Sequence, residues 1–182
     1  MKRLIVITLV IVSTLGLGQR ATAQFYAVKV NALALAVGVV DVGVEASITD
    51  SWSLGIASQL SVLNMTQRVD RFYTGEIGAK YWFFENQVGH FIGQQLKYVN
   101  YIVGKPRKKY NGEALGLGVS YGYSWILSPR WSMVAEVGVG IFYNSDVRYD
   151  PEVDDWSDEY RYHSTRITIA PSQLAISLNY LF

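Results

Sequence analysis

The feature that most constrains this chain is a strict two-residue alternation in its second half. From Ala114 to Ile126, every second residue is large and apolar or aromatic, and the residues between them are Gly, Ala or Ser. Successive side chains of a β-strand point to opposite faces, so a period of two predicts a strand. Segments 131–143 and 173–182 repeat the pattern, and no helical period of comparable strength competes with it.

Noisier alternation predicts five earlier strands, which makes eight in all. They cover about residues 26–32, 42–48, 53–62, 73–83 and 90–98, and the pattern does not assign the faces of the last. Short turns at 50–51, 84–89 and 127–130 alternate with the connections 37–41, 63–71, 99–112 and 144–165, three of which are long. This arrangement is typical of outer-membrane barrels. We therefore expect an all-β fold, an eight-stranded antiparallel up-and-down transmembrane β-barrel with short periplasmic turns and longer extracellular loops.

The composition of the two faces distinguishes a membrane barrel from a soluble one. A soluble eight-stranded barrel places its large apolar residues inside. Here the second face consists mainly of Gly, Ala and Ser with a few charges, which suits a narrow interior better than a hydrated surface. The large apolar face is therefore expected to meet lipid.

The first 23 residues have the pattern of a cleaved secretory signal peptide. Lys2 and Arg3 precede an apolar run from Leu4 to Leu17, and Ala21-Thr22-Ala23 provides a small-x-small cleavage pattern. A membrane anchor is the alternative, but a helix of this length spans only about 21 Å of a hydrocarbon core of about 30 Å. We expect a signal peptide at 1–23 and a mature outer-membrane barrel at 24–182.

Charge and cysteine content exclude several classes of function. The 182-residue chain has a formal net charge of +1, and removal of the three basic residues of the signal peptide changes it to −2. A nucleic-acid-binding protein needs a large positive excess, so no nucleic-acid partner is expected. The absence of cysteine excludes disulfides and a thiolate nucleophile.

Aromatic residues mark one end of the predicted barrel. Trp52, Trp125 and Trp131 lie beside the short turns and predict an interfacial aromatic girdle. Trp82 lies at the same end but on the inward parity. The alternating C-terminal residues Leu178, Tyr180 and Phe182 are similar to the signal that the outer-membrane assembly machinery reads.

Charged residues on the inward parity predict a polar network inside the barrel. Because isolated charges in a narrow lumen are costly, we expect them to pair as a structural core. The alternative is an ion path or proton relay. The predicted network consists of Lys29, Asn31, Glu45, Glu76, Lys80, Glu136 and Gln173.

The two longest connections carry opposite charge. Residues 99–112 include a basic cluster at 105–109, and 144–165 is strongly acidic. They are interpreted as solvated loops, with an anionic glycolipid or another surface ligand as a candidate partner. The acidic loop lacks the EF-hand spacing, and His163 with an acidic neighbour is a weak hydrolase pattern. We expect no catalytic residues, metal or cofactor.

Several segments resemble a family of small outer-membrane β-barrel proteins from Bacteroidota that is classified as a domain of unknown function. The similar stretches are 29–31, 50–54, 80–83, 89–93, 118–131 and 175–182. The resemblance implies fold and location, and it brings no catalytic residues or ligand. The first loop, Val37 to Asp41, is shorter and more apolar than the family pattern.

Together these observations favour a monomeric protein of the cell outer membrane with a structural or surface-binding role through loops 99–112 and 144–165. Its expected partners are the lipid bilayer, the assembly machinery and a surface ligand or glycolipid. A narrow pore for ions or small solutes is the first alternative. A loop-borne hydrolase or acyltransferase is the second.

Overall fold

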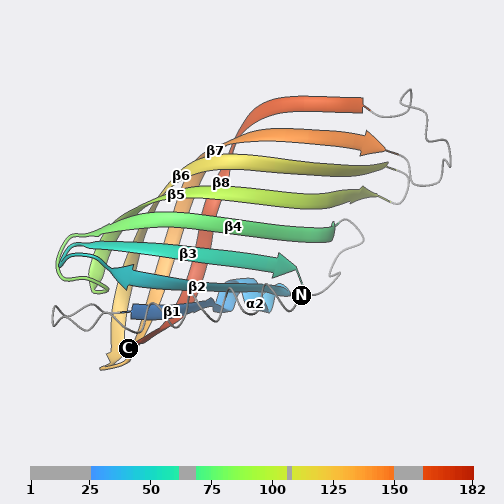
Figure 1. The fold of residues 1–182 in the computed structure, drawn as a ribbon. Helices are drawn as coiled ribbons and strands as arrows, with labels where there is room; N and C mark the ends of the chain where they lie inside the picture. The colour runs from blue at the N-terminus through green and yellow to red at the C-terminus, as the bar shows by residue number, and fades with distance from the viewer. Residues whose placement is uncertain (1–25, 62–68, 106–107, 150–161) are drawn as a thin grey trace, which may run out of the picture.

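Eight antiparallel strands close into a barrel in the computed structural model, which describes residues 26–61, 69–105, 108–149 and 162–182 (Figure 1). Each strand pairs with the next along the chain, and β1 also pairs with β8. The predicted eight-stranded up-and-down antiparallel barrel is therefore confirmed. The elements are β1 (Tyr26–Asn31), α2 (Ala32–Ala36), β2 (Val39–Ser47), β3 (Trp52–Ser61), β4 (Val69–Trp82), β5 (Gly89–Lys105), β6 (Lys108–Ser128), β7 (Trp131–Tyr149) and β8 (Tyr162–Leu181). Within these residues, no helix has the length and hydropathy to cross a membrane.

The two faces of the barrel wall follow the predicted alternation. On β6 the small residues from Ala114 to Ser124 are buried, whereas Leu115, Leu117, Val119 and Tyr121 are exposed. The same division continues on β7 and on the second half of β8. Large apolar side chains thus cover the outside of the barrel, and mostly small or polar ones fill the inside.

Two predicted long loops are wrong in their extent. Most of 99–112 belongs to β5 and β6, which remain paired as far as Lys105 and Lys108. Residues 144–149 and 162–165 likewise extend β7 and β8 as a paired ribbon. In both extensions polar residues interrupt the apolar alternation, so the strand pattern fades although backbone pairing continues. Residues 106–107 and 150–161 lie outside the described residues.

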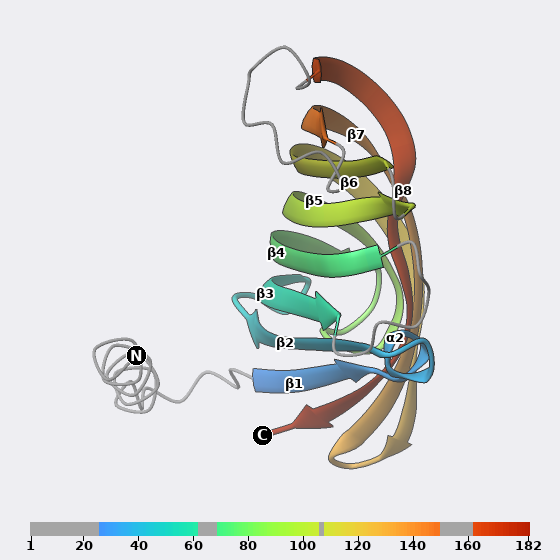
Figure 2. The same ribbon diagram turned by 90° about the vertical axis from the view of Figure 1, so that its right-hand side faces the viewer.

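The strands are unequal, and this leaves the barrel open on one side at the long-strand end. β1 pairs with β8 only from Ala27–Leu181 to Asn31–Ser177, whereas β7 follows β8 up to Tyr162. Figures 1 and 2 show the long strands curving away beyond the short β1–β3 edge. The short helix α2 replaces the end of the predicted first strand and part of the connection to β2. The Asn31 side chain caps it by accepting hydrogen bonds from the backbone N–H groups of Leu33 and Ala34.

A small apolar core fills the turn end of the barrel. Trp82 and Phe91 are 1% and 0% exposed, their ring centroids lie 4.6 Å apart, and Val134 completes the cluster. Gly122 makes this packing possible, because a Cβ there would overlap the Phe91 ring. The inward position of Trp82 follows from its parity.

Candidate functional site

The main polar site inside the barrel is centred on Lys80. Its Nζ lies 3.1 Å from Oε2 of Glu45 and 3.3 Å from Oε2 of Glu136, so one ammonium joins carboxylates from two distant strands. The same nitrogen lies 4.5 Å from the centroid of the Phe91 ring, a cation–π contact. Lys29 lines the same small cavity. Lys80 is therefore held from both sides of the lumen.

Neutral side chains satisfy the remaining oxygens of the two carboxylates. Ser53 donates to Oε1 of Glu45 at 2.5 Å, and Trp82 in turn donates from its indole N–H to the Ser53 hydroxyl at 2.9 Å. Ser120 donates to Oε1 of Glu136 at 2.7 Å. Buried charges are tolerated when they are paired and fully hydrogen bonded, and these bonds meet that condition.

The turn between β4 and β5 inserts a further group into the barrel. Gln87 is 2% exposed and donates from Nε2 to Oε1 of Glu45 at 2.9 Å, while its backbone carbonyl accepts from the Ser124 hydroxyl at 2.7 Å. Its backbone has a φ of 67°, a left-handed conformation that is uncommon for a residue other than glycine. The residue thus combines a strained backbone conformation with a side chain that points into the barrel. The turn thus closes the short-turn end of the barrel.

A second ionic cluster surrounds Lys97 of β5. Its Nζ lies 2.9 Å from Oε2 of Glu76 and donates to Oε1 of Gln173 at 3.0 Å and to the backbone carbonyl of Ser172. The Ser172 carbonyl is available because β8 contains a bulge here, where the register shifts between the partners of Gly138 and Val139. A bulge leaves its extra residue outside the ladder of backbone hydrogen bonds.

A third hydrogen-bonded cluster lies inside the barrel where β1 pairs with β8. Nδ2 of Asn31 donates to Oδ2 of Asp41 at 2.9 Å, and Nε2 of Gln59 donates to the same oxygen at 3.0 Å. Oδ1 of Asn31 also accepts from the Ile176 backbone N–H at 3.3 Å. Asn31 therefore links helix α2, strand β2 and strand β8 with one side chain.

All seven residues predicted for the interior network lie inside the barrel, in these three groups. Sequence reasoning missed Lys97, because the faces of the fifth strand were not assigned. Asp41 was missed because it was placed in the first loop, and Gln87 because it lies in a turn. For Lys97 and Asp41, strand pairing supplied the face that the residue types alone did not indicate.

Open space inside the barrel is distributed unevenly. Around Lys80 the cavity measures about 20 Å³, close to the volume that one water molecule needs. At the long-strand end a cavity of about 270 Å³ is lined by aromatic and apolar side chains, such as Phe72 and Phe142, together with polar ones that include Lys97. Thr74 also lines it, and its buried hydroxyl has no hydrogen-bond partner among the described residues. The lumen is therefore narrow at its centre and wider at one end.

Aromatic rings form a series of contacts around the outside of the short-turn end. Trp52 lies 5.2 Å from Tyr81, and Trp131 lies 5.1 Å from Tyr180, measured between ring centroids. Trp125 contacts Tyr123 at 4.7 Å, and Tyr123 contacts His90 at 4.5 Å. The three tryptophans predicted for the girdle are each 43–46% exposed. They point outward at the same end of the barrel.

The remaining candidate residues are only partly described. Leu178 and Phe182 are 43% and 68% exposed, and Tyr180 stacks edge-on against Phe182 at 4.9 Å. His163 lies on β8 opposite Val147 and not in a loop, and its side chain lies outside the described residues. Most of the acidic cluster of 144–165 also lies outside them.

The geometry defines a class of protein: a closed eight-stranded β-barrel with an apolar exterior, an ion-paired interior and an aromatic belt at one end. Within that class, the chain belongs to the family described as "Protein of unknown function (DUF3575)", whose pattern matches residues 5–182. The predicted membership of a family of unknown function is confirmed, and an origin in Bacteroidota stays a prediction. A search of curated proteins finds no match.

Proposed function

We propose that this protein is a monomeric β-barrel of the bacterial outer membrane with a closed lumen and a structural or surface-binding role. The observation that carries the proposal is the exposure of large aliphatic side chains around the wall, such as Leu117 at 68%, Val137 at 59% and Ile77 at 57%. A soluble monomer rarely exposes so extensive an apolar surface. A barrel is also one of the two structures that satisfy every backbone hydrogen bond in lipid.

The aromatic belt and the two chain ends support the same location. Exposed Trp52, Trp125 and Trp131 at one end have the position of an interfacial girdle. The exposed Leu178 on the last strand and Phe182, which directly follows it, suit recognition by the assembly machinery. The signal-peptide pattern at 1–23 provides the route across the inner membrane.

The proposed surface role belongs to the long-strand end. There the extensions of β5–β8 replace part of the predicted loops, and the 270 Å³ cavity lies next to them, with its lining drawn from strands β3–β8. Apolar and aromatic side chains that bury a ligand, combined with polar groups that orient it, are typical of small-ligand sites. A surface ligand or glycolipid is the proposed partner, and the proposal assigns no catalytic residue, metal or cofactor.

The membrane location is tested with purified protein refolded into phospholipid vesicles. The folded barrel should float with the vesicles, resist protease and shift its gel mobility only after heating in detergent. These results are expected because a closed ladder of backbone hydrogen bonds resists detergent at room temperature. A fully protease-sensitive protein that stays out of the vesicles would contradict the proposal.

The closed lumen predicts little ion conductance. In planar bilayers we expect no steady channel openings from the wild-type protein, because paired charges and a cavity of about 20 Å³ occupy the centre of the lumen. Steady openings that change with Glu136→Gln, but not with the exposed control Glu113→Gln, would instead support the narrow pore.

A further inference from the structure

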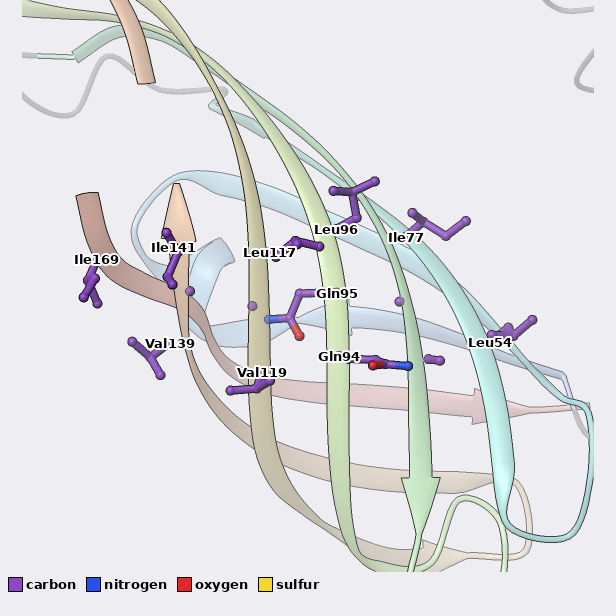
Figure 3. Close-up of a pocket in the computed structure, with 14 residues that line it drawn as sticks. Leu54, Ile77, Gln94, Gln95, Leu96, Leu117, Val119, Val139, Ile141 and Ile169 are labelled. Atoms are coloured by element: carbon purple, nitrogen blue, oxygen red, sulfur yellow. The ribbon is translucent and has the colours of Figure 1, made fainter. Parts of the chain in front are cut away.

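The cavity of about 270 Å³ at the long-strand end is lined by side chains that face the lumen. One level of this lining follows strand pairing from β3 to β7 and consists of Gln59, Thr74, Val99, Ala114 and Asn144. The outside of the wall nearby is aliphatic, as Figure 3 shows for Leu96, Leu117 and Ile141. Hydrogen-bonding groups are therefore concentrated on the lumen side of this part of the barrel.

The cavity is accessible from the long-strand end. Thr168 lines it as the β8 partner of Phe142, yet Thr168 is exposed, because the short strands β1–β3 leave that side of the barrel open (Figure 2). Lys97 lies two residues nearer the short turns than Val99 and lines the inner end. A ligand that enters from the long-strand end therefore stops at the ionic cluster of Lys97.

The charges around the cavity are already paired within the protein. The three N–H groups of Lys97 are taken by Glu76, by Gln173 and by a backbone carbonyl of β8. Nearer the long-strand end, the buried Asp146 lies 3.6 Å from Arg166. An anionic ligand would meet Asp146 and find no free ammonium on Lys97, whereas a cationic ligand would be repelled by Lys97. Because burial of an unpaired charge is costly, the site favours an uncharged ligand.

The lining combines aromatic rings with neutral hydrogen-bonding groups. Phe72 and Tyr101 are partners on β4 and β5, and the Phe142 ring lies over Gly116, where a Cβ would overlap it. Thr74 is 1% exposed, and its hydroxyl has no hydrogen-bond partner among the described residues. A buried hydroxyl without a partner is costly, so a ligand that bonds to it would gain affinity.

We propose that this cavity binds the ring of an uncharged sugar, a hexopyranose, at the level of Thr74 and Asn144. A pyranose ring has an apolar face of C–H groups, which suits the aromatic side chains, and an edge of hydroxyls, which suits the amides and hydroxyls. The volume of about 270 Å³ lies near the lower limit of ligand pockets, about 300 Å³, so it suits one ring. This inference rests on the proposed surface-binding role and specifies its ligand. A free sugar and the terminal residue of a surface glycan share this chemistry.

The test titrates the purified barrel with the methyl pyranosides of glucose, galactose, mannose and N-acetylglucosamine. Saturation-transfer NMR measures binding in lauryldimethylamine oxide, a detergent without a sugar headgroup. We expect at least one glycoside to bind the wild type with millimolar affinity. Ala114→Leu fills the cavity and should weaken binding at least tenfold. Thr74→Val keeps the shape, removes the hydroxyl and should weaken binding several-fold. The control Thr165→Val makes the same change on the exposed outer face of β8 and should bind like the wild type.

Charged and apolar analogues test the ligand class. The 6-phosphate and the 2-amino form of the bound sugar should bind at least tenfold more weakly than the neutral form. Tighter binding of either charged form, or displacement of the sugar by an equal concentration of cyclohexanol, would overturn the assigned class. A trisaccharide that ends in the same sugar distinguishes the two sources. Its binding supports the end of a glycan, and binding of the monosaccharide alone supports a free sugar.

Two results would overturn the site itself: no binding of the four glycosides to the folded wild type, or equal binding by Ala114→Leu and the wild type. Heat-shift and flotation assays on every variant keep this inference apart from the proposed function. A barrel that inserts but binds no sugar contradicts only the sugar site, whereas one that fails to insert contradicts the membrane location.

Discussion

Replacing Lys80 by Met is expected to destabilise the barrel by about 3–5 kcal/mol, the cost of removing one partner from a buried ion pair. The loss arises because Glu45 and Glu136 both depend on this ammonium, at 3.1 Å and 3.3 Å. Their side chains are only 3% and 6% exposed, so removal of the ammonium leaves two buried carboxylates close to each other. Urea unfolding in vesicles, followed by tryptophan emission, measures the change.

A compensated variant separates the ion pairs from the packing of the lysine stem. Because Lys29 lines the same cavity, the compensated variant is Lys29→Met/Glu45→Gln/Lys80→Met/Glu136→Gln, which leaves only the Glu76–Lys97 pair charged nearby. Buried ion pairs replaced by neutral residues of similar volume often cost little. We expect this quadruple variant to recover most of the stability that Lys80→Met loses. Arg130→Met, at the exposed turn between β6 and β7, controls for the loss of one positive charge and should change stability by less than about 0.5 kcal/mol. If Lys80→Met has the same urea midpoint of unfolding as the wild type, Lys80 does not hold the interior together.

The fold class could be predicted from the sequence because the alternation of large and small residues on β6 has almost no exceptions. On β6 every inward position from Ala114 to Ser124 is small, so the alternation alone assigned both faces. The same reasoning worked on β7 and on β8 after the bulge. Small residues on one face and aliphatic residues on the other are what a narrow barrel with an apolar exterior favours.

The polar site was harder to predict, because local residue types do not determine strand register. Gln94 and Gln95 are identical side chains on adjacent positions, yet Gln95 donates to Ser172 inside the barrel and Gln94 lies outside. Only pairing with β4 and β6 decides which one faces inward. Without that choice Lys97 had no assigned face, and its cluster with Glu76 was not predicted.

Two further errors have local causes. Ala32–Ala36 alternates Ala and Leu, yet it forms a helix, because Asn31 caps its first turn and five residues are too few to show a helical period. At β8, Ser172 and Gln173 are both buried, since the bulge places consecutive side chains on one face. The alternation therefore identified the last strand only from residue 173, although β8 begins at Tyr162 and continues through the bulge.

Leu117→Arg is expected to destabilise the barrel in vesicles by about 2–4 kcal/mol, the cost of a cationic side chain at the lipid-facing midplane of a membrane barrel. Leu117 points outward near the middle of β6 and is 68% exposed. In a soluble protein, a change at so exposed a position has little effect, within about 0.5 kcal/mol. The two environments therefore predict clearly different results for one substitution.

Asn111→Arg provides the matched control. Asn111 lies on the same strand and the same face, six residues nearer the long-strand end, and it is also exposed. In the proposed arrangement this position lies beyond the hydrocarbon, so an arginine there should cost no more than about 1 kcal/mol. Urea midpoints in vesicles measure both variants against the wild type. A large loss for Leu117→Arg with a small one for Asn111→Arg places the apolar band in lipid, because only the environment of the two arginines differs. Equal, small effects would remove the main support for an outer-membrane location, since the exposed leucines would then be in contact with water.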